Sequence, residues 1–237
     1  MLRVSALMPS QIGPCRFTPR ANAQSSINSP RMASIPPRPG ISHDRAAAGR
    51  DKRGGATAMT DDGRDLAAES WAFALKLYAE PGVSDACLKL QADTGVDVMM
   101  LLVVTFAAAQ RRILLTVPDI KEMDNECRPW REQVVRPLRA LRTALKSGPA
   151  PAPSEATDSL RSQIKASELI AERLENDLLA AWLQGRVSQD RRLAREAIGG
   201  VMRDVVLLAL GEERRHQIGS LQAAFDTLLS ATDKFVQ

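Results

Sequence analysis

Few residues of this chain are of the types that do chemistry. The sequence holds two histidines, His43 and His216, and three cysteines, Cys15, Cys87 and Cys127. The cysteines form no CxxC pair, and no Cys/His group has the spacing of a zinc site. Phosphate-binding glycine loops and the HExxH and GxSxG motifs are also absent from the sequence. The sequence therefore predicts a protein that is not an enzyme and uses no cofactor or metal.

Asp97 is the carboxylate with the most specific position, because it directly precedes an apolar stretch. At the first turn of a helix it most simply complements the N-terminal dipole. An ion pair with an arginine of residues 128–146 is a second interpretation. A catalytic carboxylate is a third, although no second acid or histidine stands near it in sequence.

Residues 127–146 form a stretch with six basic side chains and one acidic one. On a helical wheel, Trp130 and the aliphatic residues form one side and the basic residues flank it, while Pro137 should kink or restart the helix. The candidate interaction surface is Arg128, Arg131, Arg136, Arg139, Arg142 and Lys146.

These basic residues have two interpretations. Their charges pair inside the fold with carboxylates such as Glu122, Asp124, Glu126 or those of residues 168–177, or they bind an acidic partner, RNA or an anionic membrane. Residues 59–146 carry 12 basic and 13 acidic groups, and the one aromatic residue of the stretch lies on its apolar side. Single-strand binding needs exposed aromatic residues among the basic ones. Internal pairing is therefore favoured.

The elements that position these residues are helices. Residues 66–79, 84–94 and 128–146 have helical periodicity, and no strand-like alternation of useful length occurs. The apolar run at residues 98–109 is 12 residues long, short of the ~20 that a membrane span needs, so it predicts a buried central helix and no transmembrane segment. The predicted core and structural residues are Trp71, Phe73, Tyr78, Cys87, Asp97, Leu101, Trp130, Val134, Leu138 and Leu141.

The predicted fold class is all-α, a compact bundle of about four to five helices followed by a helical C-terminal extension, with a disordered N-terminus. Residues 1–58 are expected to be a disordered tail, a targeting segment or a mis-assigned start ahead of Met59. Residues 59–146 are expected to form a helical core domain, residues 147–158 a Pro/Ala linker, and residues 159–237 amphipathic helices.

Charge is spread unevenly along the chain. Residues 1–58 carry nine basic and two acidic side chains, a net charge of +7, and residues 59–237 carry 23 basic and 26 acidic ones, a net charge of −3. The overall pI of about 9.2 therefore does not by itself imply a nucleic-acid partner.

Three sequence blocks, WAFALKLYAEPGV, ACLKLQADTGVDVMMLL and PWREQVVRPLRALRTALK, lie between Trp71 and Lys146, and KASELIAERLENDLLAAWL follows from Lys165. In order and spacing they resemble an uncharacterised family of small all-helical proteobacterial proteins, a domain of unknown function. The chain departs from that pattern at the end of the central helix, where it has TFAAAQRRILL and the family pattern has an end rich in aromatic residues and glycine. The resemblance implies an all-helical fold and no assigned activity, so no catalytic residue is carried over.

Residues 159–237 contain three narrow apolar stripes that need a partner surface. With the linker before them, they predict a cytoplasmic, non-catalytic helical protein that acts through another protein or through self-association. The alternative is a weak nucleic-acid or anionic-membrane binder that uses the basic flank of residues 128–146.

Overall fold

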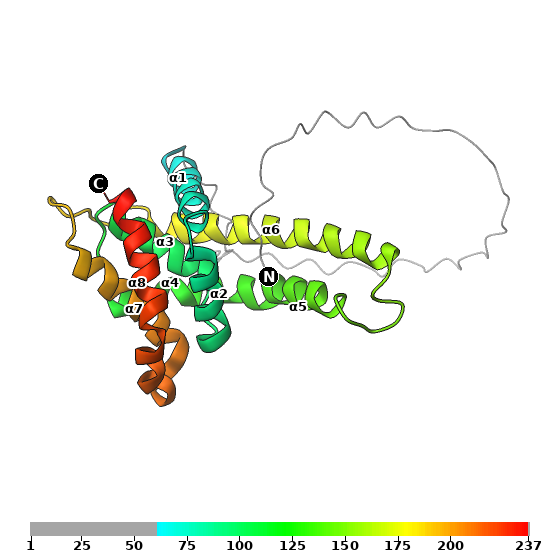
Figure 1. Ribbon diagram of the computed structural model, residues 1–237. Coiled ribbons are helices and arrows are strands. Elements are labelled where there is room, and N and C mark those ends of the chain that lie inside the picture. The colour runs from blue at the N-terminus through cyan, green and yellow to red at the C-terminus, as the bar shows by residue number, and fades with distance from the viewer. Residues whose placement is uncertain (1–60, 237) are drawn as a thin grey trace, which may run out of the picture. The chain divides into compact units, whose positions relative to one another are not determined.

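The computed structural model describes residues 61–236, with side chains from Asp65 onward. The expectations for residues 1–58 lie outside the described residues. Within the described residues no strand is present (Figure 1). The predicted all-α class is therefore confirmed.

Eight α-helices follow one another in residues 61–236, with short π- and 3-10-helical turns between some of them. Their order is α1 (Asp61–Tyr78), α2 (Val83–Thr94), α3 (Val98–Ala109), α4 (Val117–Trp130), the π-helical turn η1 (Arg131–Val135), α5 (Arg136–Ala144), α6 (Glu155–Leu183), α7 (Arg195–Arg214), the 3-10 turn η2 (Arg215–Leu221), α8 (Gln222–Thr232) and the 3-10 turn η3 (Asp233–Phe235).

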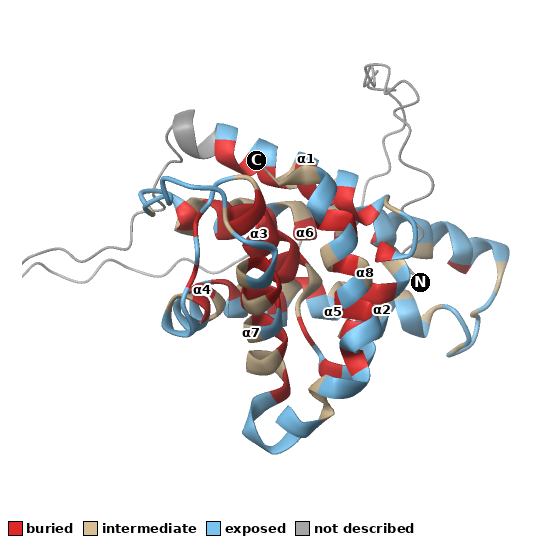
Figure 2. Cartoon of the chain, turned by 60° about the vertical axis from the view of Figure 1, so that its left-hand side comes forward, coloured by how far each residue is buried: buried red, intermediate tan, exposed pale blue. Residues whose placement is uncertain are grey.

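The central helix α3 is apolar on every side and almost every residue of it is buried. Helices α1, α6 and α7 pack around it (Figure 2). Phe106 of α3 illustrates this packing. Its side chain is fully buried, and the centroid of its ring lies 5.7 Å from the ring centroid of Phe73 on α1. In the part of the chain that is described, no helix is long and apolar enough to cross a membrane.

The helices before and after residues 147–158 share this core. Helix α1 packs on α6, α2 on α8 and α3 on α7, and all described residues fall in one compact unit. Residues 147–154 of the predicted linker are therefore a loop between α5 and α6, and residues 155–158 form the first turn of α6. The start of α6 is fixed by a capping box in which Ser154 and Thr157 exchange hydrogen bonds. The structure differs here from the predicted boundary, because the apolar faces of α6 and α7 are needed to cover α3.

The helix that carries the basic stretch changes its geometry before Pro137. The backbone N–H of Arg136 donates to the carbonyl of Arg131, five residues back, instead of four. This π-helical turn adds one residue to the turn, which rotates everything after it by about 100° relative to a continuous α-helix. Proline has no N–H and clashes with the preceding turn of a regular helix, which explains the position of the change.

The ten predicted core residues differ in how far they are buried. Phe73, Tyr78, Cys87 and Leu101 are buried as predicted. Trp71, Asp97, Trp130, Val134 and Leu138 are only partly buried.

Leu141 is 49% exposed, so its prediction as a core residue is wrong. In the π-helical turn itself, Val135 is buried, whereas the adjacent Val134 is only partly buried. The physical reason is the π-helical turn. Because the turn contains one extra residue, Arg139 and Arg142 point in the directions that Leu138 and Leu141 would have in a continuous α-helix.

Candidate functional site

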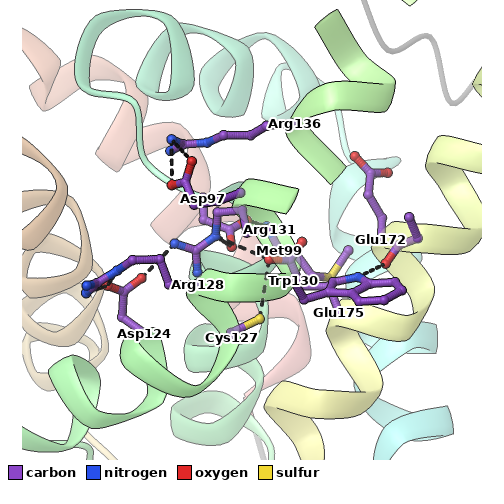
Figure 3. Close-up of polar contacts among 12 residues, drawn as sticks. Asp97, Met99, Asp124, Cys127, Arg128, Trp130, Arg131, Arg136, Glu172 and Glu175 are labelled. Carbon is purple, nitrogen blue, oxygen red and sulfur yellow. Dashed lines mark hydrogen bonds and ion pairs between the residues drawn. The ribbon is translucent and has the colours of Figure 1, made fainter. Parts of the chain in front are cut away.

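A buried arginine joins four elements of the fold (Figure 3). The side chain of Arg131 is 9% exposed. Its Nε donates to Asp97 Oδ2 at 2.6 Å and to Glu175 Oε1 at 3.2 Å, and its Nη1 donates to Asp124 Oδ1 at 2.7 Å. A guanidinium group suits this arrangement, because its donors have a fixed planar geometry that matches carboxylates.

The acids around Arg131 come from three different helices. Asp97 is the N-cap of α3 and accepts a hydrogen bond from the backbone N–H of Met99 at 2.9 Å. Asp124 lies on α4 and Glu175 on α6. The dipole and ion-pair interpretations of Asp97 therefore both hold, and one carboxylate does both.

The charge states of this cluster differ from residue to residue. Burial raises the pKa of Glu175 to about 9, and the charge of Asp97 and a hydrogen bond with it act in the same direction. Burial also raises the pKa of Asp124, but hydrogen bonds from Arg128 and Arg131 outweigh it and the net shift is downward. Burial lowers the pKa of Arg131, and its three acidic neighbours reverse this, so it stays charged. Near neutral pH, Glu175 therefore holds its proton beside the charged guanidinium of Arg131.

Cys127 completes the cluster on the side of α4. Its Sγ donates to Glu175 Oε1 at 3.4 Å, and burial raises the pKa of the thiol. Burial also raises the pKa of Cys87 to about 12. Both thiols are free and buried. A thiol of this kind is not a nucleophile, because the reactive form of cysteine is the thiolate.

A second set of ion pairs joins α5 to α6. Arg139 donates to Glu168 at 2.9 Å and to Glu172 at 2.6 Å, and Arg142 also pairs with Glu168. Burial raises the pKa of Glu168, but hydrogen bonds from Arg142 and Arg139 outweigh it and the net pKa is lowered. Burial raises the pKa of Glu172. We call these four residues the α5–α6 ion cluster.

The remaining predicted interaction residues lie at the surface. Arg128 pairs with Asp124 at 2.6 Å, and Arg136 pairs with Glu132 at 2.7 Å. Lys146 is exposed and has no ion pair within the described part of the chain. All five arginines of the predicted surface thus form ion pairs within the chain. Four of the five pair with Asp124 or with carboxylates of residues 168–177, as the internal-pairing interpretation expects.

Trp130 anchors the start of this region. Its indole Nε1 donates to the carbonyl of Ala171 on α6 at 3.0 Å. A partly buried tryptophan of this kind packs its ring and satisfies its single donor at once. It is not available as a stacking platform for bases, which agrees with its predicted place on the apolar side.

Two hollows border the Arg131 cluster. One of about 380 Å³ is lined by Asp97, Arg131 and Glu175 among others, and a second of about 170 Å³ also borders Asp97 and Arg131. Among the described residues, no group of three or more His, Cys, Asp or Glu side chains has the arrangement of a metal site.

The fold and this cluster define a class of protein: an all-helical bundle organised around a buried arginine and its carboxylates. A family model described as Protein of unknown function (DUF2390) matches residues 69–179. The resemblance to an uncharacterised family is therefore confirmed, and the matched range contains every residue of the Arg131 cluster. No curated protein and no solved structure matches the chain.

Proposed function

We propose that this protein is a non-catalytic, cytoplasmic helical interaction protein that self-associates through α6. One observation carries the proposal: a line of large apolar side chains is exposed on this helix. Ile170 is 64% exposed, and Leu160, Leu174 and Leu178 are 46%, 45% and 47% exposed. We call these four residues the α6 stripe. Free buried thiols at Cys87 and Cys127 support the cytoplasmic location.

The α6 stripe lies beside the face of α6 that packs into the bundle. Ile164, Ala171 and Leu179 are buried against the other helices, whereas residues 170, 174 and 178 are spaced four apart and therefore lie on one side of the helix. A helix in a monomer usually needs one apolar face. The exposed stripe widens the apolar surface of α6 beyond the part that the bundle covers, which supports a helix–helix contact with another molecule.

The charges beside the stripe favour a second copy of the same chain. Arg173 and Asp177 flank it, with side chains 42% and 28% exposed, and they lie 3.5 Å apart within one chain. If two α6 helices cross antiparallel near Leu174, Arg173 of each copy lies within one helical turn of Asp177 of the other. In a parallel two-fold pair, the flanks that carry these residues lie on opposite sides of the contact and cannot pair across it. A two-fold antiparallel dimer is therefore the arrangement that we propose.

Light scattering after size exclusion tests the association itself. The full chain should behave as a dimer at concentrations in the tens of micromolar, and Ile170→Lys with Leu174→Lys should shift it to a monomer with unchanged circular dichroism. Ser162→Lys, an exposed change on another side of α6, is the matched control and should stay dimeric. A full chain that is monomeric throughout this range contradicts the proposal.

Cysteine cross-linking tests the orientation. In a Cys15→Ser background, Leu174→Cys should form a disulfide with itself across the two-fold axis. Ser167→Cys should not react with itself, but should react with Ala181→Cys in a mixed sample. Self-reaction at all three positions indicates a parallel dimer. A dimer that reacts at none of them uses a different surface.

A further inference from the structure

Two loops lie side by side where α3 and α6 end. One comprises residues 110–116, between α3 and α4, and the other residues 184–194, between α6 and α7. The backbone N–H of Gln189 donates to the carbonyl of Arg112 at 2.8 Å, and Arg112 Nη1 donates to the carbonyl of Asp190 at 3.5 Å. In Figure 1 both loops are on the left-hand side of the view. The fold thus makes one surface from two segments that are distant in sequence.

Positive charge is concentrated on this surface. The two loops hold five arginines and one aspartate, a net charge of +4, namely Arg111, Arg112, Arg186, Arg191, Arg192 and Asp190. Because residues 59–237 carry a net charge of −3 in total, the rest of that range carries −7. A molecule with this asymmetry presents one basic end to an acidic partner.

Three of these arginines are available to a partner. Arg111 pairs with Glu69 at 3.2 Å, and Arg186 pairs with Asp119 at 2.9 Å. Arg112, Arg191 and Arg192 are exposed. Within residues 65–236, none of the three has a carboxylate partner. They differ in this respect from the arginines of residues 128–146, which are paired.

Exposed aliphatic side chains lie among the arginines. Val187 is 83% exposed, Leu114 is 44% exposed, and Val117 at the start of α4 is 42% exposed. Leu114 and Val187 each stand two residues from the hydrogen bond between Arg112 and Gln189. The two loops contain no aromatic residue. Aliphatic side chains lower their free energy by leaving water for an apolar medium, but they give no stacking platform for nucleic-acid bases.

We propose that residues 110–117 and 184–194 form an interaction surface for an anionic phospholipid bilayer. Arg112, Arg191 and Arg192 bind the lipid phosphates, while Val187 and Leu114 enter the boundary between head groups and acyl chains. The contact is peripheral and requires no spanning helix. It does not depend on self-association through the α6 stripe, which is a different surface.

Vesicle co-sedimentation of the full chain tests this proposal. The protein should bind phosphatidylcholine vesicles with about 30% phosphatidylglycerol and not pure phosphatidylcholine vesicles, and binding should weaken with salt. Arg112→Ala, Arg191→Ala and Arg192→Ala together should lower the partition coefficient about 100-fold, since each arginine near a membrane contributes about a fivefold factor. Val187→Ser should lower it a few-fold, through its apolar contact.

A matched triple variant controls for net charge. Arg128→Ala, Arg136→Ala and Arg215→Ala remove the same charge from arginines that pair with neighbouring acids, and they should leave the partition coefficient within about twofold of the parent. Residues 1–58 carry their +7 in every variant. Equal losses in both triple variants, or no binding at low salt, contradict the proposal. Loop-dependent binding to an oligonucleotide, without binding to vesicles, assigns the surface to nucleic acid instead.

Discussion

Glu175 shows how one buried side chain links the stability of this fold to pH. It faces Asp97, Arg131 and Cys127, and its pKa is raised from 4.5 to about 9. The folded state therefore holds a proton that the unfolded state loses above about pH 4.5. Its contribution to stability is fully present below that value and is lost as the pH rises to about 9.

Replacing Glu175 with glutamine should remove this share of the pH dependence. Glutamine keeps the shape of a neutral carboxyl group and cannot ionise, so Glu175→Gln should be more stable than the parent near pH 9 and similar to it near pH 5. Urea unfolding across this range measures the effect. Parallel stability curves for parent and variant would show that Glu175 is already ionised in the folded protein.

Arg131 should be the most costly arginine to remove. Arg131→Met leaves the carboxylates of Asp97 and Asp124, which are 10% and 13% exposed, without their cation, which should lower the free energy of unfolding by about 3–5 kcal/mol. Arg128→Met removes an exposed pair and should cost less than about 1 kcal/mol. Urea denaturation of the two variants makes the comparison. Equal costs would mean that the Arg131 cluster contributes no more than a surface ion pair.

At the scale of elements, α5 depends on charge more than on apolar packing. None of its residues is buried, and the α5–α6 ion cluster links it to its neighbour. Glu168→Gln weakens the pairs of both Arg139 and Arg142. Hydrogen exchange of residues 136–146 should therefore become at least about tenfold faster, because hydrogen bonds to charged groups contribute about 1.5–3 kcal/mol.

Helix α3 is the internal control for that experiment. Its amides are protected by a core that Glu168 does not enter, so their exchange should stay unchanged. Faster exchange in both helices would mean that Glu168 stabilises the whole unit and that α5 has no separate opening.

The sequence predicts the helices well and the rotation of α5 poorly. Periodicity gives the all-α class, and the position of Asp97 before an apolar run indicates both its cap and its ion pair. A helical wheel assumes 100° for each residue, so it assigns Leu141 to the core and places Arg139 beside it. Pro137 marks where the helix must adjust, but the π-helical turn depends on the fit of α5 against α6. The sequence does not reveal the basic surface, because Arg112 and Asp190 are far apart in the chain and come into contact only in the folded protein.

At the scale of the whole molecule, residues 59–146 and 159–237 should not fold separately. Each fragment would expose the apolar surface that the other covers, since α3 packs against both α6 and α7. Either fragment alone should show little near-ultraviolet circular dichroism, and mixing the two should restore it. If the fragment of residues 59–146 instead gave a nuclear magnetic resonance spectrum with sharp, dispersed amide signals, it would fold alone. Residues 59–146 would then be an independent domain, as the sequence predicts.

The all-apolar surface of α3 also bears on how the chain is made. Residues 98–109 leave the ribosome well before α7, which ends at residue 214. At about 5–20 residues per second, roughly 5 to 20 s pass before the covering helices exist. During that interval the nascent chain carries a strip that any other apolar surface can bind. The yield of folded protein should therefore depend on the speed of translation and on chaperones, even where the finished molecule is stable.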